Sequence, residues 1–193
     1  MTRKMSRQEL KRMVEKTIIR DEEKKRIDWS ATSGVSEILL NLNSSLEGLD
    51  DGQIQRNRQI YGENRLTEYG RKKVLQMLVN CWIKPSYKVL RRQERAMSIP
   101  SKDLVVGDIV LLSEGDKVPG DLRVITSVGL FVDQGDLTGD RAPASKGAGR
   151  SLLTKKEVVD YTNILLMGSR VVSGKAKAVV LSVGDHTIFG TKL

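Results

Sequence analysis

The pattern of apolar and polar positions divides the chain into a helical first half and a β-rich second half. Between about Ser6 and Arg26, apolar residues recur at helical spacing, at positions 10, 13, 14, 18 and 19. This spacing predicts a helix whose remaining positions are mostly charged. Because its apolar stripe is narrow, we expect the helix to dock weakly or to fray.

Two further short helices are predicted between residues 30 and 66. Ser30 or Thr32 is expected to cap the first, since hydroxyl side chains accept hydrogen bonds from the free amides of a first turn. Asp50 and Asp51 suit the start of the second through the helix dipole. Gly62 is expected to end it, because glycine readily adopts the left-handed conformation that closes a helix.

From Val105 onward, β-branched runs alternate with Gly-Asp turns, which indicates short strands. Ser173-Gly174 is expected to form a hairpin turn between two of the strands. The strands are predicted at 108–112, 122–126, 130–132, 169–172 and 176–183. Short strands joined by tight turns are typical of a compact antiparallel β domain, so the expected fold class is α+β.

The domain organisation follows from these changes of pattern. We expect a basic helical leader at 1–27, a helical region at 28–70, a basic and apolar linker at 71–101, and the β domain at 102–193.

Charge adds a bias toward anionic partners in the first half. The net charge is +9, and residues 1–101 hold 21 Lys and Arg against 13 Asp and Glu. Such a region could meet an anionic membrane surface through residues 1–26 and 71–92, although solvated mixed-charge helices give the same balance. The aromatic fraction of 4% and the lack of a recognition motif argue against nucleic acid.

Other residue types exclude several classes of protein. Cys81 is the single cysteine and His186 the single histidine, so neither a disulfide nor a Cys- or His-rich metal site is expected. Cys81 lies among apolar residues and is expected to be a buried, inert thiol, whereas His186 is expected in a turn after a strand. The longest apolar run, Val74–Ile83, is too short to cross a bilayer, so we expect a soluble or peripheral chain without a signal peptide.

Four segments of the second half carry a family resemblance. They read, in order, DLVVGDIVLLSEGDKVPGDLRVI, LFVDQGDLTGDRAPASK, NILLMGSRVVSGKAKAVV and VGDHTIFG. Together they resemble the actuator domain of P-type cation-transporting ATPases, and GLDDGQIQRNRQIYGENRL at 48–66 is similar to the N-terminal cytoplasmic region of those pumps. The resemblance implies a distorted, jelly-roll-like β domain. The segment LMGSRVVSGKAKAVV is most similar to the corresponding sequence of the magnesium-transporting branch.

The resemblance also implies a role for one loop. In these pumps a Thr-Gly-Glu-Ser loop swings over an aspartyl-phosphate on a separate domain and positions the water that hydrolyses it. Thr138, Gly139, Asp140 and Arg141 stand at those four positions here. Thr138, Gly139 and Asp140 are therefore the candidate catalytic residues, with the Asp140 carboxylate at the loop tip as the group that orients or deprotonates water. The glycine is expected to let the backbone approach closely.

The loop departs from the family pattern at two positions. Asp140 replaces Glu, which withdraws the carboxylate by one methylene, about 1.5 Å. Arg141 replaces Ser and is expected to modulate the loop, either by binding phosphate or by pairing with Asp140. The loop is therefore either a working variant or one retired from chemistry, in which case the protein would be a partner or regulator of an intact pump.

The resemblance finally implies what else such a pump needs. No Asp-Lys-Thr-Gly-Thr or Walker-type phosphate loop occurs, and no membrane hairpin lies beside Lys84-Pro85, so we expect part of a pump that cannot hydrolyse ATP or move ions alone. ATP and Mg²⁺ would belong to the parent pump, with no cofactor or metal in this chain. The expected partner is the pump's phosphorylation domain, in cis or in trans, on the cytoplasmic side of the membrane.

Overall fold

A computed structural model describes residues 7–66, 86–91, 95–152, 154 and 157–192, and the side chains of all of these except 7–16, 95 and 192. The helices are α1 (Arg7–Thr32), α2 (Val35–Asn41), α3 (Asp51–Tyr61), α5 (Gly135–Thr138) and α6 (Ile188–Lys192), with 3-10 turns η1 (Ser101–Asp103), η2 (Val158–Asp160) and η3 (Gly184–His186). The strands are β1 (Ser86–Arg91), β2 (Arg95–Pro100), β3 (Ile109–Ser113), β4 (Asp121–Asp133), β5 (Ala144–Ser145), β6 (Ile164–Leu165) and β7 (Arg170–Ser182).

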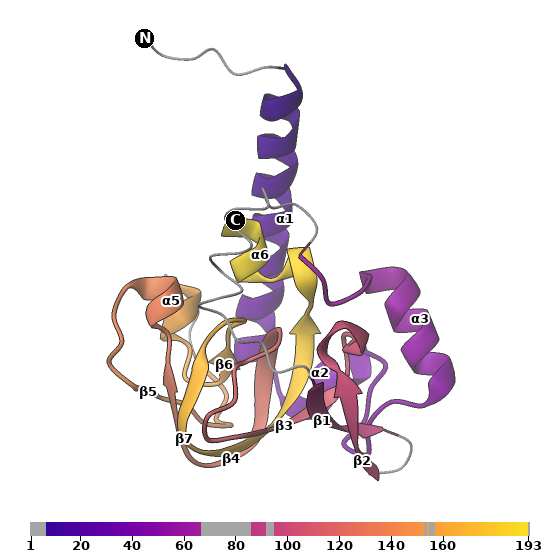
Figure 1. The fold of residues 1–193 in the computed structure, drawn as a ribbon, viewed down its shortest axis with the longest axis vertical. Helices are drawn as coiled ribbons and strands as arrows, with labels where there is room; N and C mark the ends of the chain where they lie inside the picture. Colours follow the sequence, from indigo (N-terminus) through magenta and orange to yellow (C-terminus); the bar gives the residue numbers. More distant parts are fainter. Residues whose placement is uncertain (1–6, 67–85, 92–94, 153, 155–156, 193) are drawn as a thin grey trace.

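The described strands form one antiparallel sheet, which confirms the α+β fold class. Their order is β2-β1-β3-β7-β4-β5, and β6 pairs with β4 away from this path. Strands β4 and β7 run side by side for most of their length and curve together through the lower part of the molecule (Figure 1). Aliphatic residues from the sheet and from α1 and α2 fill a single core.

Two expected breaks in the strands are absent from the described structure. The predicted strands at 122–126 and 130–132 are one strand, β4, and the expected hairpin at Ser173-Gly174 is wrong because β7 passes through it without reversing. Gly129 and Gly174 both have positive φ, and the β4–β7 register shifts beside Gly129. A Cβ on Gly174 would lie 2.2 Å from the Gly129 oxygen, so the glycines permit a close contact at a bulge.

Part of the expected linker at 71–101 is sheet. Strands β1 and β2 pair with each other, and β1 also pairs with β3. Tyr87, Val89 and Ile99 alternate with more exposed neighbours and enter the core, which is the pattern of a half-buried strand. Val74–Ile83, Cys81 and Lys84-Pro85, on which several predictions rest, lie outside the described residues.

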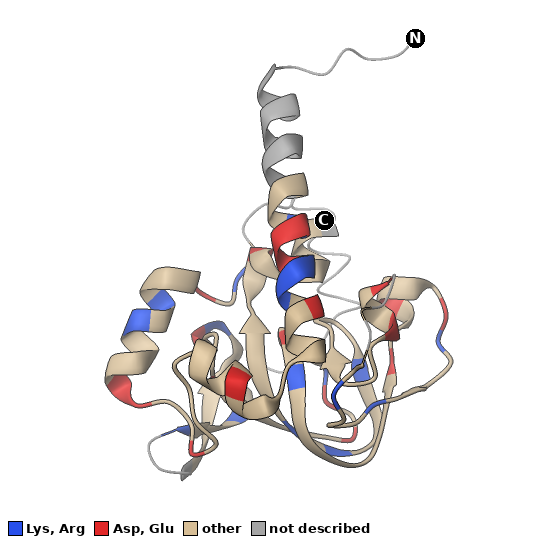
Figure 2. Ribbon diagram, turned by 180° about the vertical axis from the view of Figure 1, so that it is seen from behind, with Lys and Arg blue, Asp and Glu red and all other residues tan. Residues whose placement is uncertain are grey.

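Helix α1 extends past the predicted end at Arg26 to Thr32, and it docks firmly through this last part, which the prediction did not include. Ile27 and Ala31 are fully buried, whereas Ile18 of the predicted stripe is 53% exposed. The helix runs behind the sheet beside α6, and its described part carries both signs of charge (Figures 1 and 2). Ser30 and Thr32 belong to α1, so neither caps the next helix; Gly34 stands at that position.

The helical region after α1 is tied by buried amides to the turns that flank strands β3, β4 and β7. Asn57 on α3 donates to the Val106 oxygen at 2.8 Å, and Asn64 donates to Pro119 O and accepts from Gly184 N. The predicted ends of α3 are confirmed. Asp50 caps it in a capping box with Gln53, and Gly62 ends it with a φ of 79°.

His186 lies in a turn after β7, as predicted, and contacts α1. Its Nδ1 atom is 3.6 Å from a carboxylate oxygen of the buried Glu23, and this contact raises the pKa of His186 against the opposing effect of burial. In the part of the chain that the structure describes, no helix is long and apolar enough to cross a membrane.

Candidate functional site

The loop at 138–141 lies where β4 ends, on the flank of the molecule that carries α5 (Figure 1). The single helical turn α5 closes at Gly139, which has a φ of 82° in the left-handed region. A side chain is strained in this conformation, so glycine is needed for its φ. No described residue lies within 4 Å of a Cβ built on Gly139, and its expected close approach to a phosphorylated partner stays a prediction.

Asp140 stands at the exposed tip of the loop, as the resemblance implied. Its Oδ1 atom accepts a hydrogen bond from the Ala142 amide at 2.9 Å, and its own amide donates to the Thr138 hydroxyl at 3.1 Å. No described residue bonds to the Oδ2 atom. One carboxylate oxygen therefore orients the loop, and the other faces solvent.

Arg141 does not pair with Asp140, so that expectation is wrong in this structure. Its Nη1 atom lies 3.3 Å from Asp133 Oδ2 and its Nη2 atom 3.3 Å from Asp136 Oδ1. The stem of Arg141 packs against Gly135, where a Cβ would come within 2.5 Å of its Cγ. Arg141 thus links the end of β4 to α5, and it forms no ion pair with Asp140.

Lys117 supports this arrangement through Asp136, and no sequence motif indicated its role. Its side chain is 5% exposed and its Nζ atom lies 2.9 Å from Asp136 Oδ2. Asp133 also accepts from the Gly135 amide at 2.6 Å, which fixes the chain where β4 leads into α5. These groups and Arg170 surround a small polar cavity of about 230 Å³ beside the loop.

The exit of the loop is fixed by a buried lysine. Lys146 donates to the Tyr161 oxygen at 2.6 Å and to the Val159 oxygen at 3.1 Å. Burial lowers the pKa of this ammonium to about 8. Both ends of the 138–141 loop are therefore held by charged side chains.

Two buried acidic residues of the β half, Asp108 and Asp121, have structural partners. Asp108 is fully buried and meets Arg91 in a two-bond contact, Nε to Oδ1 at 2.7 Å and Nη2 to Oδ2 at 2.6 Å. Burial raises the pKa of Asp108, and Arg91 opposes this shift. Asp121 accepts from the Met167 and Ile188 amides, and burial raises its pKa to about 7. These carboxylates support the fold away from the loop.

The loop presents one exposed carboxylate, that of Asp140, on a tight turn. The cationic side chains of Arg141 and Lys117 hold the neighbouring segment in place. Such a carboxylate can orient water or accept its proton once a reacting partner is brought to it. No group of three or more metal-ligating side chains occurs in the described ranges.

Comparison with known families gives two overlapping matches. Residues 82–192, more than half of the chain, match the family model of the P-type ATPase actuator domain. Residues 30–91 match the model of the cation transporter/ATPase N-terminus.

Individual relatives are cation pumps of several kinds. The chain is 35% identical over 106 residues to a sodium/potassium-transporting ATPase subunit alpha of Drosophila melanogaster. The aligned residues are 55% of this chain and 10% of that protein. It is 43% identical over 90 residues, 47% of the chain, to a mouse calcium-transporting ATPase type 2C member 1, and covers 10% of it. It is 40% identical over 94 residues, 49% of the chain, to a magnesium-transporting ATPase, P-type 1, of Salmonella typhimurium, again covering 10%. The chain thus spans about a tenth of the relatives it matches.

Proposed function

The chain belongs to the P-type ATPase family, of which it carries the actuator domain, and from this premise we propose that its 138–141 loop positions water for aspartyl-phosphate hydrolysis. Asp140 would orient the water or accept its proton, while Thr138 and Gly139 set the turn that presents the carboxylate. The observation that carries this proposal is the exposed Asp140, whose Oδ1 atom is held by the Ala142 amide and whose Oδ2 atom faces solvent.

The partner in this proposal is the phosphorylation domain of a cation pump, on the cytoplasmic side of the membrane. An actuator domain has no phosphate of its own to hydrolyse, so the reaction requires that partner in cis or in trans. ATP and Mg²⁺ would act there, on the parent pump, and not on this chain.

The experiment follows aspartyl-phosphate loss from the phosphorylated catalytic domain of a related cation pump with and without this protein. We expect added protein to accelerate the loss in a saturable manner. A rate that stays unchanged although binding is measured would contradict the proposal. It would support the alternative, a partner or regulator retired from chemistry.

That alternative rests on a specific observation, the ion pairs of Arg141. Because Arg141 bridges Asp133 and Asp136, the loop is braced by residues outside the family's four-residue motif. Such bracing would also suit a loop that serves only as a docking surface. Binding without acceleration is the outcome that separates the two functions.

The finer proposal is that the parent pump transports magnesium. It rests on the amino-acid sequence of residues 166–180, which is most similar to the magnesium-transporting branch. The relatives themselves include calcium, sodium/potassium and magnesium pumps. We expect disruption of the coding sequence to impair growth at low Mg²⁺, with recovery on added Mg²⁺. Recovery on Ca²⁺, Na⁺ or K⁺ instead would contradict the magnesium assignment.

A further inference from the structure

One face of the sheet carries a row of mainly polar side chains that the proposed function does not use. The pairing of β2, β1, β3, β7 and β4 aligns Ser98, Lys88, Leu111, Lys177 and Thr126 across five strands. Since side chains two residues apart share a face of a strand, Lys175 lies on the same face as Lys177. The other face of these strands enters the core.

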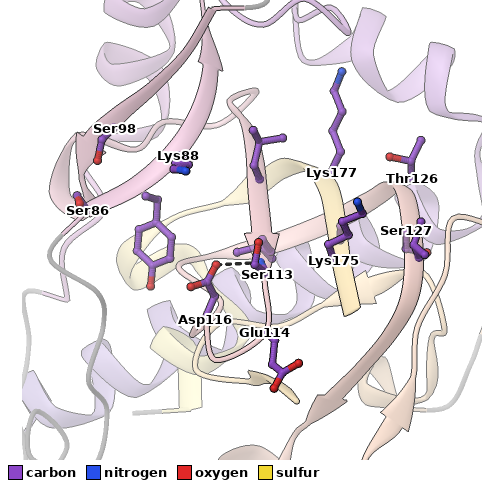
Figure 3. Close-up of a pocket in the computed structure, with 15 residues that line it drawn as sticks. Ser86, Lys88, Ser98, Ser113, Glu114, Asp116, Thr126, Ser127, Lys175 and Lys177 are labelled. Atoms are coloured by element: carbon purple, nitrogen blue, oxygen red, sulfur yellow. Dashed lines mark hydrogen bonds between the residues drawn. The ribbon is translucent and has the colours of Figure 1, made fainter. Parts of the chain in front are cut away.

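These side chains line a hollow of about 780 Å³. Figure 3 shows Lys88 on one side of it, Lys175 and Lys177 on β7, and Thr126 and Ser127 on the far side. The backbones of Lys88 and Lys177 are two strands apart, about 10 Å, and those of Lys175 and Lys177 are about 7 Å apart. Three flexible ammonium groups can therefore converge on one small volume.

Among the described residues, Lys88, Lys175 and Lys177 form no ion pair with an acidic side chain. Asp116 is 6% exposed and accepts from the Ser113 amide at 2.9 Å, so it serves its own turn, while Glu114 lies on that same side (Figure 3). The pKa of Glu47 is lowered mainly by hydrogen bonds from its own backbone and from Ser45, and least by Lys177.

We infer that this hollow is a binding site for a soluble anion with two or more linked phosphate groups. Each phosphate group concentrates between one and two negative charges, so linked phosphate groups place several charges within reach of all three ammonium groups. Lysine ammonium groups and hydroxyls supply the donors that phosphate oxygens accept. The volume is that of a small-molecule site.

The site lies apart from the catalytic proposal. The residues lining the hollow include none of the 138–141 loop or of its supports Lys117, Asp133 and Asp136. Anion binding can therefore be measured on this chain without a pump partner. Its failure would leave the proposed function untouched.

The test is titration of the full chain with tripolyphosphate at 150 mM salt, followed by calorimetry and amide chemical shifts. We expect saturable binding with shifts at 86–88, 111–113 and 175–177, and about tenfold weaker binding of orthophosphate. Replacing Lys88, Lys175 and Lys177 together by Gln should weaken binding by about 10- to 100-fold.

A matched control separates a site from diffuse attraction to a basic chain. Lys25, Arg56 and Lys102 are exposed and lie outside the hollow, so their triple replacement by Gln removes the same charge. We expect tripolyphosphate affinity to change less than about twofold in this control. Equal losses in both triple variants, or equal binding of orthophosphate, would overturn the inference.

Two further titrations test whether the hollow binds a membrane surface or an acidic peptide instead. Vesicles of phosphatidylserine and a phosphorylated phosphoinositide, and a glutamate-rich peptide, are titrated under the same conditions. Lysine-dependent binding to either of these without binding of tripolyphosphate would also overturn the inference, in favour of a membrane or an acidic protein segment. Unchanged thermal unfolding of both triple variants verifies that the fold is intact.

Discussion

Replacement of Arg91 by Met is expected to lower the free energy of unfolding by about 3–5 kcal/mol, because it leaves a buried carboxylate without its counter-charge. Asp108 is fully buried and Arg91 is 7% exposed, so water cannot replace the lost partner. Arg91 also donates to the Asp103 oxygen at 3.0 Å, which ties β1 to the turn before β3. The measurement is urea unfolding at neutral pH, read as ΔG in the absence of denaturant.

The control for this prediction is the same change at an exposed ion pair. Arg65 lies 2.8 Å from Glu63, but their side chains are 57% and 46% exposed. Because solvent screens such pairs, Arg65→Met should cost less than about 1 kcal/mol. Equal costs at the two sites would contradict the argument.

Two variants keep this prediction measurable if Arg91→Met fails to fold. Arg91→Lys retains the charge but not the two-bond geometry, and should fall between wild type and Arg91→Met. Asp108→Asn added to Arg91→Met removes the orphaned charge and should restore part of the lost stability. No recovery would mean that packing of Arg91, and not its charge, stabilises the fold.

The sequence predicted local features that depend on nearby residues. Asp50, Gln53 and Gly62 set the ends of α3 by interactions within a few positions, and the structure confirms the Asp50 and Gly62 predictions. The β-rich second half was also predictable, since alternating β-branched runs are a local signal. The position of Asp140 at the exposed tip follows from the motif itself.

Features that depend on distant partners were not predictable. Ser30 has a good capping side chain, yet its carbonyl accepts from Arg123 inside the core and α1 continues past it. Gly174 favours positive φ in a hairpin and in a bulge alike, and its contact with Gly129 across the sheet selects the bulge.

In the candidate site, too, the residues within the motif were predictable and their distant partners were not. The motif identified Thr138, Gly139, Asp140 and Arg141, but the partners of Arg141 come from the end of β4 and from α5. Lys117 lies 19 residues from Asp136 in sequence, so only the fold brings them together. The direction of the Arg141 side chain could not be read from the motif because these acids compete with Asp140 for it.

Asp140→Asn is expected to reduce the acceleration of aspartyl-phosphate loss by about 100-fold or more, the range typical of a lost general base. Asparagine keeps the size of the side chain, and its carbonyl oxygen can still accept from the Ala142 amide, so the loop should keep its shape. The measurement is the saturating rate of phosphoenzyme decay with each variant. Glu37→Gln removes an exposed carboxylate on α2 and should leave the rate unchanged.

Asp140→Glu tests whether the shorter carboxylate limits this rate. If the attacking water lies one methylene beyond the reach of the Asp140 carboxylate, the longer Glu side chain should raise the rate of phosphoenzyme decay. A catalytic group misplaced by about 1 Å can lower a rate roughly 100-fold. Arg141→Ser alone should change it little, because Arg141 binds Asp133 and Asp136 and leaves Asp140 unpaired with it. A rate that rises only when both changes are combined would instead mean that Arg141 blocks the approach to phosphate. An Asp140→Asn protein as active as wild type would remove this carboxylate from the reaction.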